Sequence, residues 1–290
     1  MNTRPGLTII IPAYNEAAGV TETLKRLFEA AEQSNIEHEV IVVDDCSTDA
    51  TASLVEAFPK VNLIRHRRNQ GYGASIKTGM RRAKYDWTGI VDADGTYDPA
   101  KLFELYGLGE NCDMVVGSRT GENVEYSTLR KIPKIFLRRF MVWIAQEDIP
   151  DMNSGLRVFR TEVGCKYMPI YPSGFSLTTT ITMAMLCNQY AVKFVPIDYF
   201  TRQGVSHIKP IRDTLRFIRL IAMTGMMFAP LRILGPLIIF FFFGFVVSLF
   251  YDVFFLQNLT DKTLIFLTTG FNLSVFGALA EMIRKYREIS

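Results

Sequence analysis

The feature that most constrains the fold of this chain is a charge-free apolar run, ILGPLIIFFFFGFVVSLFY, from Ile233 to Tyr251. An α-helix needs about 20 apolar residues to cross the hydrocarbon core of a bilayer. A chain in lipid must also satisfy its own backbone hydrogen bonds, so such a run is expected to be helical. Up to about Thr201, by contrast, apolar residues come in short runs broken by charges. The sequence therefore predicts a soluble domain followed by a membrane segment.

A second apolar run, Thr263 to Ile283, is a weaker candidate because it contains an asparagine, several hydroxyl groups and Glu281. The linker DVFFLQNLTDK between the runs carries one lysine, whereas Arg232 precedes the first run and RKYRE follows the second. Basic residues concentrate on the cytoplasmic side of membrane proteins. We therefore expect a two-helix transmembrane hairpin over 233–290 with both ends inside; a buried helical hairpin is the alternative.

The first two hundred residues alternate between β-rich runs and amphipathic helices. LTIIIPAYN and HEVIVVDDCSTDAT end in polar turns, and apolar residues at one-face helical spacing follow each of them. VNLIRH, the turn NQGYGAS, a helix through Ile76 and Met80, and the strand WTGIVDAD continue the pattern. Strands that alternate with helices argue for a parallel sheet covered on both faces. The predicted fold class is α/β, with one domain over 1–207.

Composition excludes some partners. The formal net charge is +3 and there is no long basic run, so no nucleic acid is expected as a partner. The four cysteines form no CxxC pair, which argues against a zinc site or a disulfide framework and favours a reducing compartment. The apolar run near the N-terminus is too short for a signal peptide. We expect an inner (cytoplasmic) membrane protein with its soluble domain in the cytosol.

Two further stretches mix basic and apolar residues: STLRKIPKIFLRRFMVWIA, and IKPIRDTLRFIRLIAMTGMMF directly before the first span. This composition suits the membrane interface. An ordinary surface helix with a solvated basic face is the alternative for each. Next to a spanning hairpin, we expect both to lie on the anionic leaflet of the lipid bilayer, the second as a juxtamembrane amphipathic helix over 208–232.

Polar clusters follow three of the predicted strands: Asn15-Glu16, Asp44-Asp45 and Asp92 to Asp94. In open α/β sheets, ligands bind beyond the carboxyl ends of the strands. Any one cluster could be a helix cap, and Asp45 is the clearest such alternative. Three clusters at one edge predict a shared ligand site instead. Asp92 and Asp94, one residue apart in a turn, can both reach one hard divalent cation whose other positions take phosphate oxygens.

Several motifs carry a resemblance to a known family. IIIPAYNE, VIVVDDCSTDAT, NQGYGASIKTG, VDADG and VVGSRTG occur in this order and spacing. With them the chain resembles inverting family 2 glycosyltransferases of the GT-A fold, a Rossmann-like, mostly parallel sheet flanked by helices. NSGLRVFR and YFTRQGVSH resemble the acceptor-side motifs of polyprenyl-phosphate sugar synthases, the group of dolichyl-phosphate mannose synthase and the undecaprenyl-phosphate glucosyl- and aminoarabinosyl-transferases. The resemblance covers about Leu7 to His207.

The resemblance implies a role for each matching residue. Asp94, Arg119 and Arg202 are the implied catalytic residues, and the two arginines would face phosphates. Glu16 would lie near the ribose and Asp44 on the base of the nucleotide-sugar. Asp92 and Asp94 would bind the diphosphate through Mg²⁺ or Mn²⁺. The implied nucleotide-sugar site comprises Pro12, Tyr14, Glu16, Asp44, Asp92 and Ala93, and the implied acceptor-phosphate site comprises Arg119, Ser154, Gly155, Arg157 and Ser206.

The implied function is transfer of a single sugar, with inversion, from a UDP- or GDP-linked donor to undecaprenyl or dolichyl phosphate. A phosphate monoester has its second pKa near about 6, so the acceptor is already an anionic nucleophile and no strong general base is required. A catalytically silent membrane scaffold, or a family 2 enzyme with a different acceptor, is the alternative. The sequence leaves open whether the protein forms a homo-oligomer.

Two positions depart from the pattern of the group. Thr96 stands where related synthases often have a glutamine, so water or Asp98 is expected to complete the metal shell. His207 stands where a lysine is usual.

Three basic residues have simpler structural interpretations. Arg119 and Arg157 could instead be salt-bridged strand residues, and Lys77 is expected to be a surface lysine.

Overall fold

The computed structural model describes residues 4–121, 131–174, 176–200, 222–223 and 225–289, with side chains described outside 131–137 and 287–289. Arg202, Ser206 and His207 lie outside the described residues, as do residues 208–221 and 224 of the predicted amphipathic helix over 208–232. The statements below concern the described residues.

The soluble domain is built on a seven-stranded sheet with the order β3-β2-β1-β4-β6-β5-β7. Its strands are β1 (Arg4–Ala13), β2 (His38–Asp44), β3 (Val61–Arg65), β4 (Tyr85–Ile90), β5 (Met114–Ser118), β6 (Arg157–Arg160) and β7 (Val192–Pro196). All paired strands are parallel except that β6 runs antiparallel to both of its neighbours, β4 and β5. The α/β class and the mostly parallel sheet expected from the sequence are confirmed.

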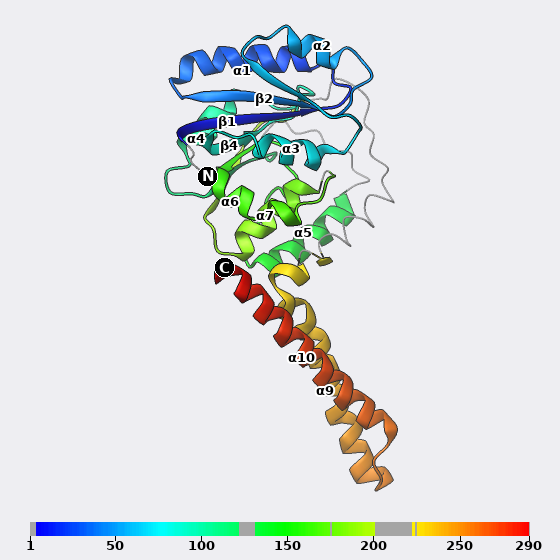
Figure 1. The fold of residues 1–290 in the computed structure, drawn as a ribbon. Helices are drawn as coiled ribbons and strands as arrows, with labels where there is room; N and C mark the ends of the chain where they lie inside the picture. The colour runs from blue at the N-terminus through cyan, green and yellow to red at the C-terminus, as the bar shows by residue number, and fades with distance from the viewer. Residues whose placement is uncertain (1–3, 122–130, 175, 201–221, 224, 290) are drawn as a thin grey trace.

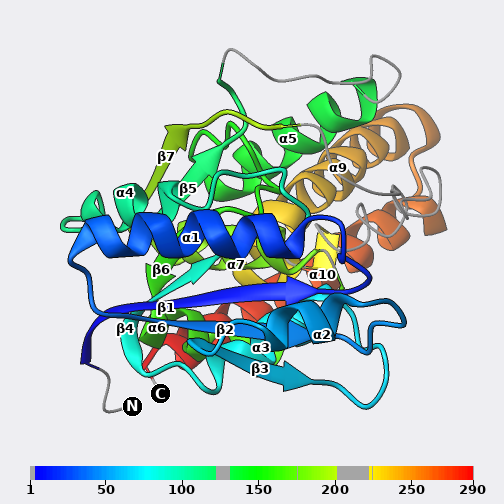
Figure 2. The same ribbon diagram turned by 90° about the horizontal axis from the view of Figure 1, so that it is seen from above.

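Helices cover both faces of the sheet (Figures 1 and 2). The domain helices are α1 (Val20–Ser34), α2 (Thr51–Glu56), α3 (Tyr72–Met80), α4 (Lys101–Gly107), α5 (Lys131–Ala145), α6 (Thr161–Lys166) and α7 (Leu177–Cys187). Successive strand residues face opposite sides of a sheet. Ile9 and Ile11 accordingly pack under α1, α2 and α4, whereas Ile10 packs with α3 and α7. The inner strands β1 and β2 therefore carry runs of buried apolar residues, whereas the edge strands β3 and β7 are only partly buried.

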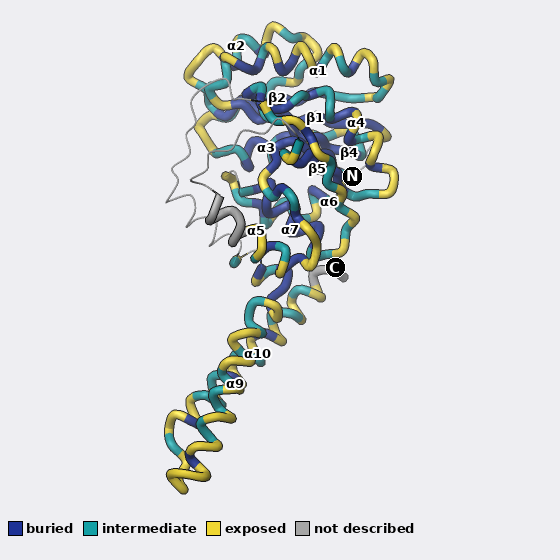
Figure 3. The backbone as a smooth tube through the Cα atoms, turned by 180° about the vertical axis from the view of Figure 1, so that it is seen from behind, coloured by how far each residue is buried: buried dark blue, intermediate teal, exposed yellow. Residues whose placement is uncertain are grey.

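The C-terminal region is a helical hairpin that projects from the domain (Figure 1). It consists of α9 (Pro230–Tyr251), a π-helical turn (Asp252–Leu256) and α10 (Asp261–Ile289). Both helices are long and apolar enough to cross a membrane. In their most apolar 18-residue windows, 0% of the first span and 17% of the second are buried, so the alternative of a buried hairpin is wrong. Figure 3 shows this contrast between the exposed hairpin and the buried interior of the sheet.

The topology brings distant segments to one edge of the sheet. The crossovers from β1 to β2 and from β3 to β4 leave β1 between β2 and β4, which is a switch point of the kind where α/β folds bind ligands. Because β6 is antiparallel, its first residue lies where its neighbours end: Arg157 pairs with Ile90 of β4 and Val116 of β5. The segment before β6 therefore joins the loops that follow β1, β2 and β4.

Candidate active site

The loops after β1 and β2 are tied together at this edge. Asn15 takes a left-handed backbone conformation with φ 55°. Its N–H donates to Ser47 Oγ at 2.9 Å, and its side-chain oxygen accepts the Thr48 N–H at 2.8 Å. The Glu16 N–H donates to Thr51 Oγ1 at 2.9 Å, at the start of α2. Asn15 and Glu16 thus contact the loop that follows Asp44 and Asp45.

The nucleotide-side residues predicted from the resemblance sit in and beside these loops. Pro12 is buried at the end of β1, and Tyr14, which follows it, is 38% exposed. Asp44 ends β2, is buried and accepts the Ser47 N–H at 3.2 Å. Ala93 is buried between the two aspartates of the DxD turn. All four therefore lie at the predicted edge, and their contacts with a nucleotide stay a prediction.

Asp45 is a structural residue. Its carboxylate accepts the N–H groups of Gln70 at 2.8 Å and Gly71 at 2.7 Å, directly before α3, and also the His66 ring Nδ1 at 2.7 Å. The other His66 nitrogen contacts Thr78 Oγ1 at 2.9 Å. The alternative that Asp45 caps the next helix is wrong, because neither α2 nor α3 has a side-chain cap and Asp45 instead holds the loop residues directly before α3.

Asp92 and Asp94 are held by neutral hydrogen-bond donors. The Tyr72 hydroxyl, on the first residue of α3, donates to Asp92 Oδ1 at 2.9 Å. Thr96 donates to Asp94 Oδ1 twice, from its hydroxyl at 2.6 Å and from its N–H at 3.1 Å. Such donors fix the orientation of a carboxylate without cancelling its charge. The departure at Thr96 therefore has a positioning role.

Asp98, expected as an alternative metal ligand, is engaged elsewhere. Its Oδ1 accepts the Ala100 N–H at 3.1 Å, and its carbonyl accepts the Lys101 N–H at 3.2 Å, where α4 begins. Asp98 therefore holds the backbone at the start of α4.

The DxD turn is enclosed by close backbone approaches. A Cβ on Gly155 would overlap Asp92 Oδ2, and a Cβ on Gly19, directly before α1, would lie 2.7 Å from the Ala93 carbonyl oxygen. The Gly155 N–H donates to the Tyr97 hydroxyl at 2.8 Å. Ser154 and Gly155 therefore lie at the DxD turn, as a shared donor and acceptor site requires.

Tyr72 and Tyr97 act as neutral groups. Burial, reinforced by the Asp92 charge, raises the pKa of Tyr72 well above its ordinary value. Burial likewise raises the pKa of Tyr97, against the opposing pull of the Arg119 charge. Both phenols are therefore protonated at physiological pH, and the Tyr72 O–H is always available as a donor to Asp92.

Arg157 lies beneath the site, fully buried. Its Nη1 donates to the Thr178 carbonyl at 2.9 Å and to Thr182 Oγ1 at 3.0 Å, and its Nη2 donates to the Ser154 carbonyl. Within the described residues its Nε has no hydrogen-bond partner. The alternative of a salt-bridged strand residue does not describe these contacts, because all three accepting groups are neutral. Direct contact with a lipid phosphate stays a prediction.

Arg119 makes a two-pronged ion pair. Its Nε and Nη2 donate to the two oxygens of Asp151 at 2.7 and 2.9 Å, and its backbone N–H adds a third bond at 3.1 Å. The Tyr199 ring centroid lies 5.2 Å from the guanidinium carbon. Although burial alone would raise it, the pKa of the Asp151 carboxyl is lowered by the Arg119 hydrogen bonds and charge. The salt-bridge alternative for Arg119 is confirmed, and phosphate contact stays a prediction.

Lys77 differs from the expectation of a surface lysine. It is half-buried, and its Nζ donates to the Tyr171 carbonyl at 3.0 Å, linking α3 to the segment before α7. Burial lowers its pKa. Gly71, which precedes α3 with φ 97°, adopts a backbone conformation that favours glycine, and a Cβ there would lie 2.5 Å from the Ser173 carbonyl oxygen.

The donor set of the DxD turn fits a hard divalent cation. Mg²⁺ and Mn²⁺ prefer oxygen ligands, and Mg²⁺ is commonly held by one or two carboxylates with substrate phosphates and water. Among the residues that the structure describes, no group of three or more His, Cys, Asp or Glu side chains could hold a metal. A metal here would therefore depend on Asp92, Asp94 and the oxygens of its substrate.

Sequence reasoning missed the supporting residues. Tyr72 lies inside the motif NQGYGASIKTG, and Tyr97 lies two residues after the motif VDADG. Their partners are 20 and 58 residues away, and no local pattern connects them. Asp151, the partner of Arg119, stands 32 residues after it and gave no signal.

The chain is similar to known glycosyltransferases in both sequence and fold. The family model described as glycosyl transferase family 2 matches residues 8–164, more than half of the chain. Among curated proteins, the chain is 32% identical over 176 residues to the succinoglycan biosynthesis protein ExoO of Rhizobium meliloti, covering 59% of this chain and 49% of that one. It is 29% identical over 245 residues to the undecaprenyl-phosphate 4-deoxy-4-formamido-L-arabinose transferase of Pseudomonas fluorescens, covering 79% and 67%.

The chain spans about half the length of the first two curated relatives, 49% and 52%. Among solved structures, glucosyl-3-phosphoglycerate synthase of Mycobacterium tuberculosis, in complex with Mn²⁺, uridine-diphosphate-glucose and phosphoglyceric acid, superposes with a TM-score of 0.59. At 14% identity, over 76% of this chain and 80% of that one, this likeness concerns the fold. It agrees with the expected GT-A architecture.

Proposed function

The chain belongs to glycosyl transferase family 2, and on that premise we propose that it transfers one sugar from a nucleotide-sugar to a polyprenyl phosphate. The donor is UDP- or GDP-linked, the acceptor is undecaprenyl or dolichyl phosphate, and the anomeric carbon is inverted. The reaction depends on Mg²⁺ or Mn²⁺. The hairpin anchors the protein in the cytoplasmic membrane, with the catalytic domain on the cytosolic side.

One observation carries the proposal. Gly155, at the start of the acceptor-side segment, lies directly against the Asp92 carboxylate at the carboxyl edge of the sheet. The two segments to which the resemblance assigns donor and acceptor roles, about sixty residues apart in sequence, thus lie against each other. In the same chain, two helices are long and apolar enough to span a bilayer. Together these features support an enzyme that receives a lipid-borne acceptor.

The residues present suit the chemistry of such a transfer. The acceptor phosphate is largely anionic at neutral pH, since the second pKa of a phosphate monoester is about 6, so the protein need not remove a proton. Its tasks are to align the phosphate with the anomeric carbon and to stabilise the departing nucleotide diphosphate. A divalent ion bound by Asp92 and Asp94 would supply positive charge to that leaving group.

Arg119 is proposed to serve the phosphates from the side of β5. Its guanidinium group is ion-paired with Asp151 and lies near the ring of Tyr199. These contacts fix the position of the guanidinium group before a substrate binds. Arg is suited to phosphate because its donors are planar and paired. Arg202 and Ser206 retain the roles given above as predictions.

The described part of α5 supports membrane proximity. Trp143 is 40% exposed and stacks with Phe140 at 5.8 Å between ring centroids. Arg138 and Arg139 are exposed on the same helix, while Met141 and Ile144 are buried in a cluster with Ala229 and Ile233 at the base of the hairpin. A helix with exposed arginines and tryptophan suits the headgroup region.

A different acceptor is the second candidate function. The curated relative with 32% identity is described as a succinoglycan biosynthesis protein, and this chain covers 49% of it. In this second candidate the acceptor is a saccharide in place of the polyprenyl phosphate. The two candidates share the donor site and differ at the segment before β6.

The decisive experiment offers both acceptor classes to the full chain. Detergent-purified protein is incubated with a panel of UDP- and GDP-sugars, Mn²⁺ and undecaprenyl phosphate, and the lipid is analysed by mass spectrometry. We expect one lipid-linked monosaccharide with one donor. A parallel incubation replaces undecaprenyl phosphate with a lipid-diphosphate-linked sugar.

The outcomes separate the candidates. Product with the second acceptor alone contradicts the polyprenyl-phosphate proposal and favours the alternative. No product with any donor, together with no metal-dependent nucleotide binding, favours the silent scaffold. Glu110→Gln, an exposed substitution far from the DxD turn in sequence, serves as a control that should retain full turnover.

A further inference from the structure

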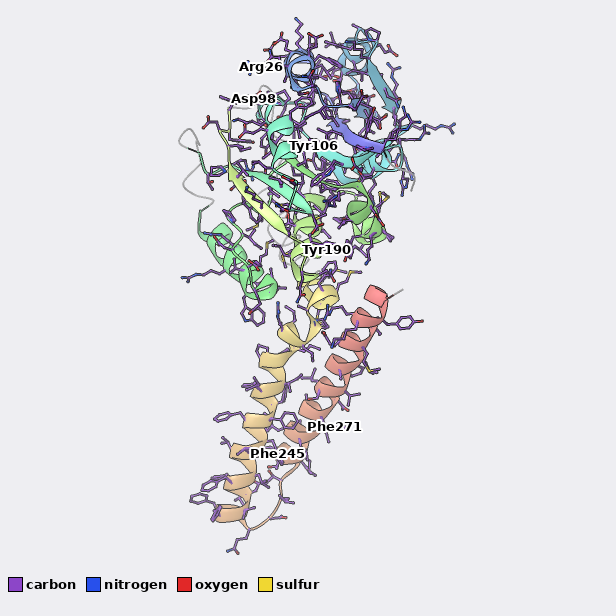
Figure 4. The ribbon with its side chains drawn as sticks, turned by 90° about the vertical axis from the view of Figure 1, so that its left-hand side faces the viewer. Arg26, Asp98, Tyr106, Tyr190, Phe245 and Phe271 are labelled. Carbon is purple, nitrogen blue, oxygen red and sulfur yellow. The ribbon has the colours of Figure 1, made fainter. Side chains whose placement is uncertain are left out.

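A second pocket lies where the soluble domain meets the hairpin. It has a volume of about 480 Å³. Its walls come from the end of α6, the segment that follows α7, the start of α9 and the last turns of α10. The lining includes Lys166, Asn188, Tyr190, Arg232, Glu281 and Arg284. Figure 4 shows Tyr190 at the base of the domain, beside the hairpin, and Arg26 and Asp98 at the far end of the domain.

This pocket is separate from the candidate active site. Asn188 and Tyr190 lead into β7, which begins at Val192, and Lys166 ends the helix that follows β6. They therefore lie at the edge of the sheet where the parallel strand β7 starts. Asp92 and Asp94 lie at the opposite edge, beyond the end of β4. A ligand in this pocket would not occupy the transfer site.

The lining is positively charged. Lys166, Arg232 and Arg284 carry three positive charges and Glu281 one negative charge, which leaves a net charge of +2. Glu281 accepts hydrogen bonds from Arg284 at 2.6 and 3.1 Å, and Arg232 donates to the Ile144 carbonyl. Burial raises the pKa of the neighbouring Cys187 thiol to about 11, against the opposing pull of the Arg232 and Arg284 charges.

The end of α7 adds little negative potential to the pocket. Helix C-termini ordinarily present unpaired carbonyls, which repel anions. Here the Asn188 side chain donates to the Ala184 carbonyl at 2.6 Å. The Leu186 carbonyl accepts the Gln189 N–H at 3.1 Å, and the Met185 carbonyl accepts the Tyr190 N–H at 3.0 Å. Among the described residues, the polar lining of the pocket thus comes from the basic side chains, Glu281, Asn188, Gln189 and Tyr190.

The position of the pocket along the hairpin indicates its depth. Arg232 directly precedes the charge-free run that begins at Ile233, and Arg284 stands in the last turn of the second candidate span, Asp261–Tyr286. Basic residues at the ends of apolar spans lie at the level of the lipid headgroups. With the hairpin in a bilayer, the pocket would open at the depth of the phospholipid phosphates, with the apolar faces of α9 and α10 below it.

We propose that this pocket binds the phosphodiester headgroup of an anionic glycerophospholipid of the cytosolic leaflet, with its acyl chains lying along the hairpin. Guanidinium groups pair well with phosphate oxygens, and basic pockets beside membrane helices suit anionic lipids. The bound lipid would fix the soluble domain relative to the membrane surface. The inference rests on the membrane hairpin of the proposed function but not on the transfer reaction.

The test measures lipid retention by the full chain. Protein purified in detergent is mixed with equal amounts of phosphatidylglycerol and phosphatidylcholine, and bound lipid is counted by native mass spectrometry. We expect retention of phosphatidylglycerol at least about tenfold over phosphatidylcholine, and loss of most of that preference in Lys166→Gln and Arg284→Gln. Lys166 is exposed, so its substitution tests the pocket even if Arg284→Gln disturbs α10.

Lys285→Gln is the matched control, because Lys285 is exposed, adjacent in sequence to Arg284 and not among the residues that line the pocket. It should keep the preference; equal loss in this variant contradicts a specific site. Glycerol 3-phosphate at the same concentration should not displace the lipid. Displacement would show that the pocket takes a soluble phosphate and would overturn the lipid assignment.

Flotation with vesicles separates this inference from the function on which it rests. A chain that floats with pure phosphatidylcholine vesicles and retains both lipids equally contradicts the lipid site alone. A chain that floats with no vesicle contradicts the membrane hairpin and this inference with it. Sugar transfer enters neither measurement.

Discussion

At the scale of single residues, the candidate site is organised by neutral hydroxyl groups around two carboxylates. Tyr72 orients Asp92, Thr96 orients Asp94, and Gly155 admits the acceptor-side backbone beside Asp92. This arrangement concentrates negative charge at one point of the sheet edge. A site of this kind is expected to respond to loss of a hydroxyl group chiefly through its affinity for metal.

Tyr72→Phe is expected to weaken the apparent affinity for Mn²⁺ by about 10- to 100-fold, because partners that orient metal ligands typically matter by that factor. The measurement is the initial rate of transfer as a function of Mn²⁺ concentration. Tyr106→Phe removes a phenol that packs against Trp87, away from the DxD turn, and should leave the titration unchanged. An unchanged titration in Tyr72→Phe would show that its hydroxyl does not support the metal site.

Gly155→Ala is expected to abolish most turnover, because the new methyl group would overlap Asp92 Oδ2. Gly107→Ala is the matched control, since a Cβ at Gly107 meets nothing within 4 Å. Both variants are assayed for transfer, and thermal unfolding checks that they fold. Full activity in a folded Gly155→Ala protein would contradict the close approach of the two segments.

Asp151→Asn is expected to destabilise the protein by about 2 kcal/mol at neutral pH, which corresponds to a fall in Tm of roughly 4–8 °C. Because the pKa of Asp151 is lowered in the folded protein, its contribution is complete above the unfolded pKa and is lost as pH falls through the folded pKa. The difference in Tm between the variant and the wild type should be constant from about pH 6 to about pH 8. It should shrink below about pH 4. A pH-independent difference would show that the charge of Asp151 is not responsible.

At the scale of elements, the site depends on where two short segments begin. Asp45 holds the loop directly before α3, which begins at Tyr72, and β6 starts at the carboxyl edge because it runs antiparallel to its neighbours. The parallel strands and their polar ends could be predicted, since apolar runs and turn residues are local signals. The direction of β6 could not, because a four-residue strand takes its direction from its pairing partners, 67 residues earlier for Arg157 and Ile90.

Local sequence patterns could predict the position of a site residue only where that residue directly follows a strand. Asp92, Asp94, Asp44 and Glu16 follow strands, so the topology of a parallel sheet alone brings them to one edge. The burial of Arg157 depends on α7, whose Thr178 and Thr182 accept its guanidinium. These two hydrogen bonds join residues that are 21 and 25 positions apart in the sequence, so no local sequence pattern predicts them.

Asp45→Asn is expected to lower the free energy of unfolding by about 1–3 kcal/mol, because two N–H groups and the His66 ring lose a charged acceptor. The comparison is thermal unfolding of the detergent-purified chain. Asp148→Asn, at a side chain that is 74% exposed, should change stability by less than about 0.5 kcal/mol. Equal effects in the two variants would contradict a structural role for Asp45 in the loop before α3.

At the scale of the whole molecule, a family 2 catalytic fold is joined to a hairpin that projects exposed aromatic and aliphatic side chains along its length. Phe243 and Phe276, at 69% and 66% exposed, represent the two helices. Apolar surface of this extent is favourable in lipid and costly in water. The hairpin and the basic residues at its base support the proposal that the domain is held at the membrane surface.

The orientation of the hairpin can be tested by cysteine labelling. Asn258 lies in the tight turn between α9 and α10, and Glu110 lies on the surface of the soluble domain; both are exposed. In intact cells, Asn258→Cys is expected to react with a membrane-impermeant maleimide, and Glu110→Cys only after permeabilisation. The reverse pattern would place the catalytic domain outside the cytosol and contradict the proposed topology.

The central claim is that Asp92 and Asp94 hold a divalent ion that serves the diphosphate of the donor. The most direct measurement is Mn²⁺ binding by electron paramagnetic resonance, with and without nucleoside diphosphate, in wild type and in Asp94→Ala, alongside the mass-spectrometric transfer assay. The wild-type protein should bind Mn²⁺ in the presence of the nucleotide, and folded Asp94→Ala should lose both that binding and turnover. Wild-type turnover and nucleotide-dependent Mn²⁺ binding in Asp94→Ala would contradict the account.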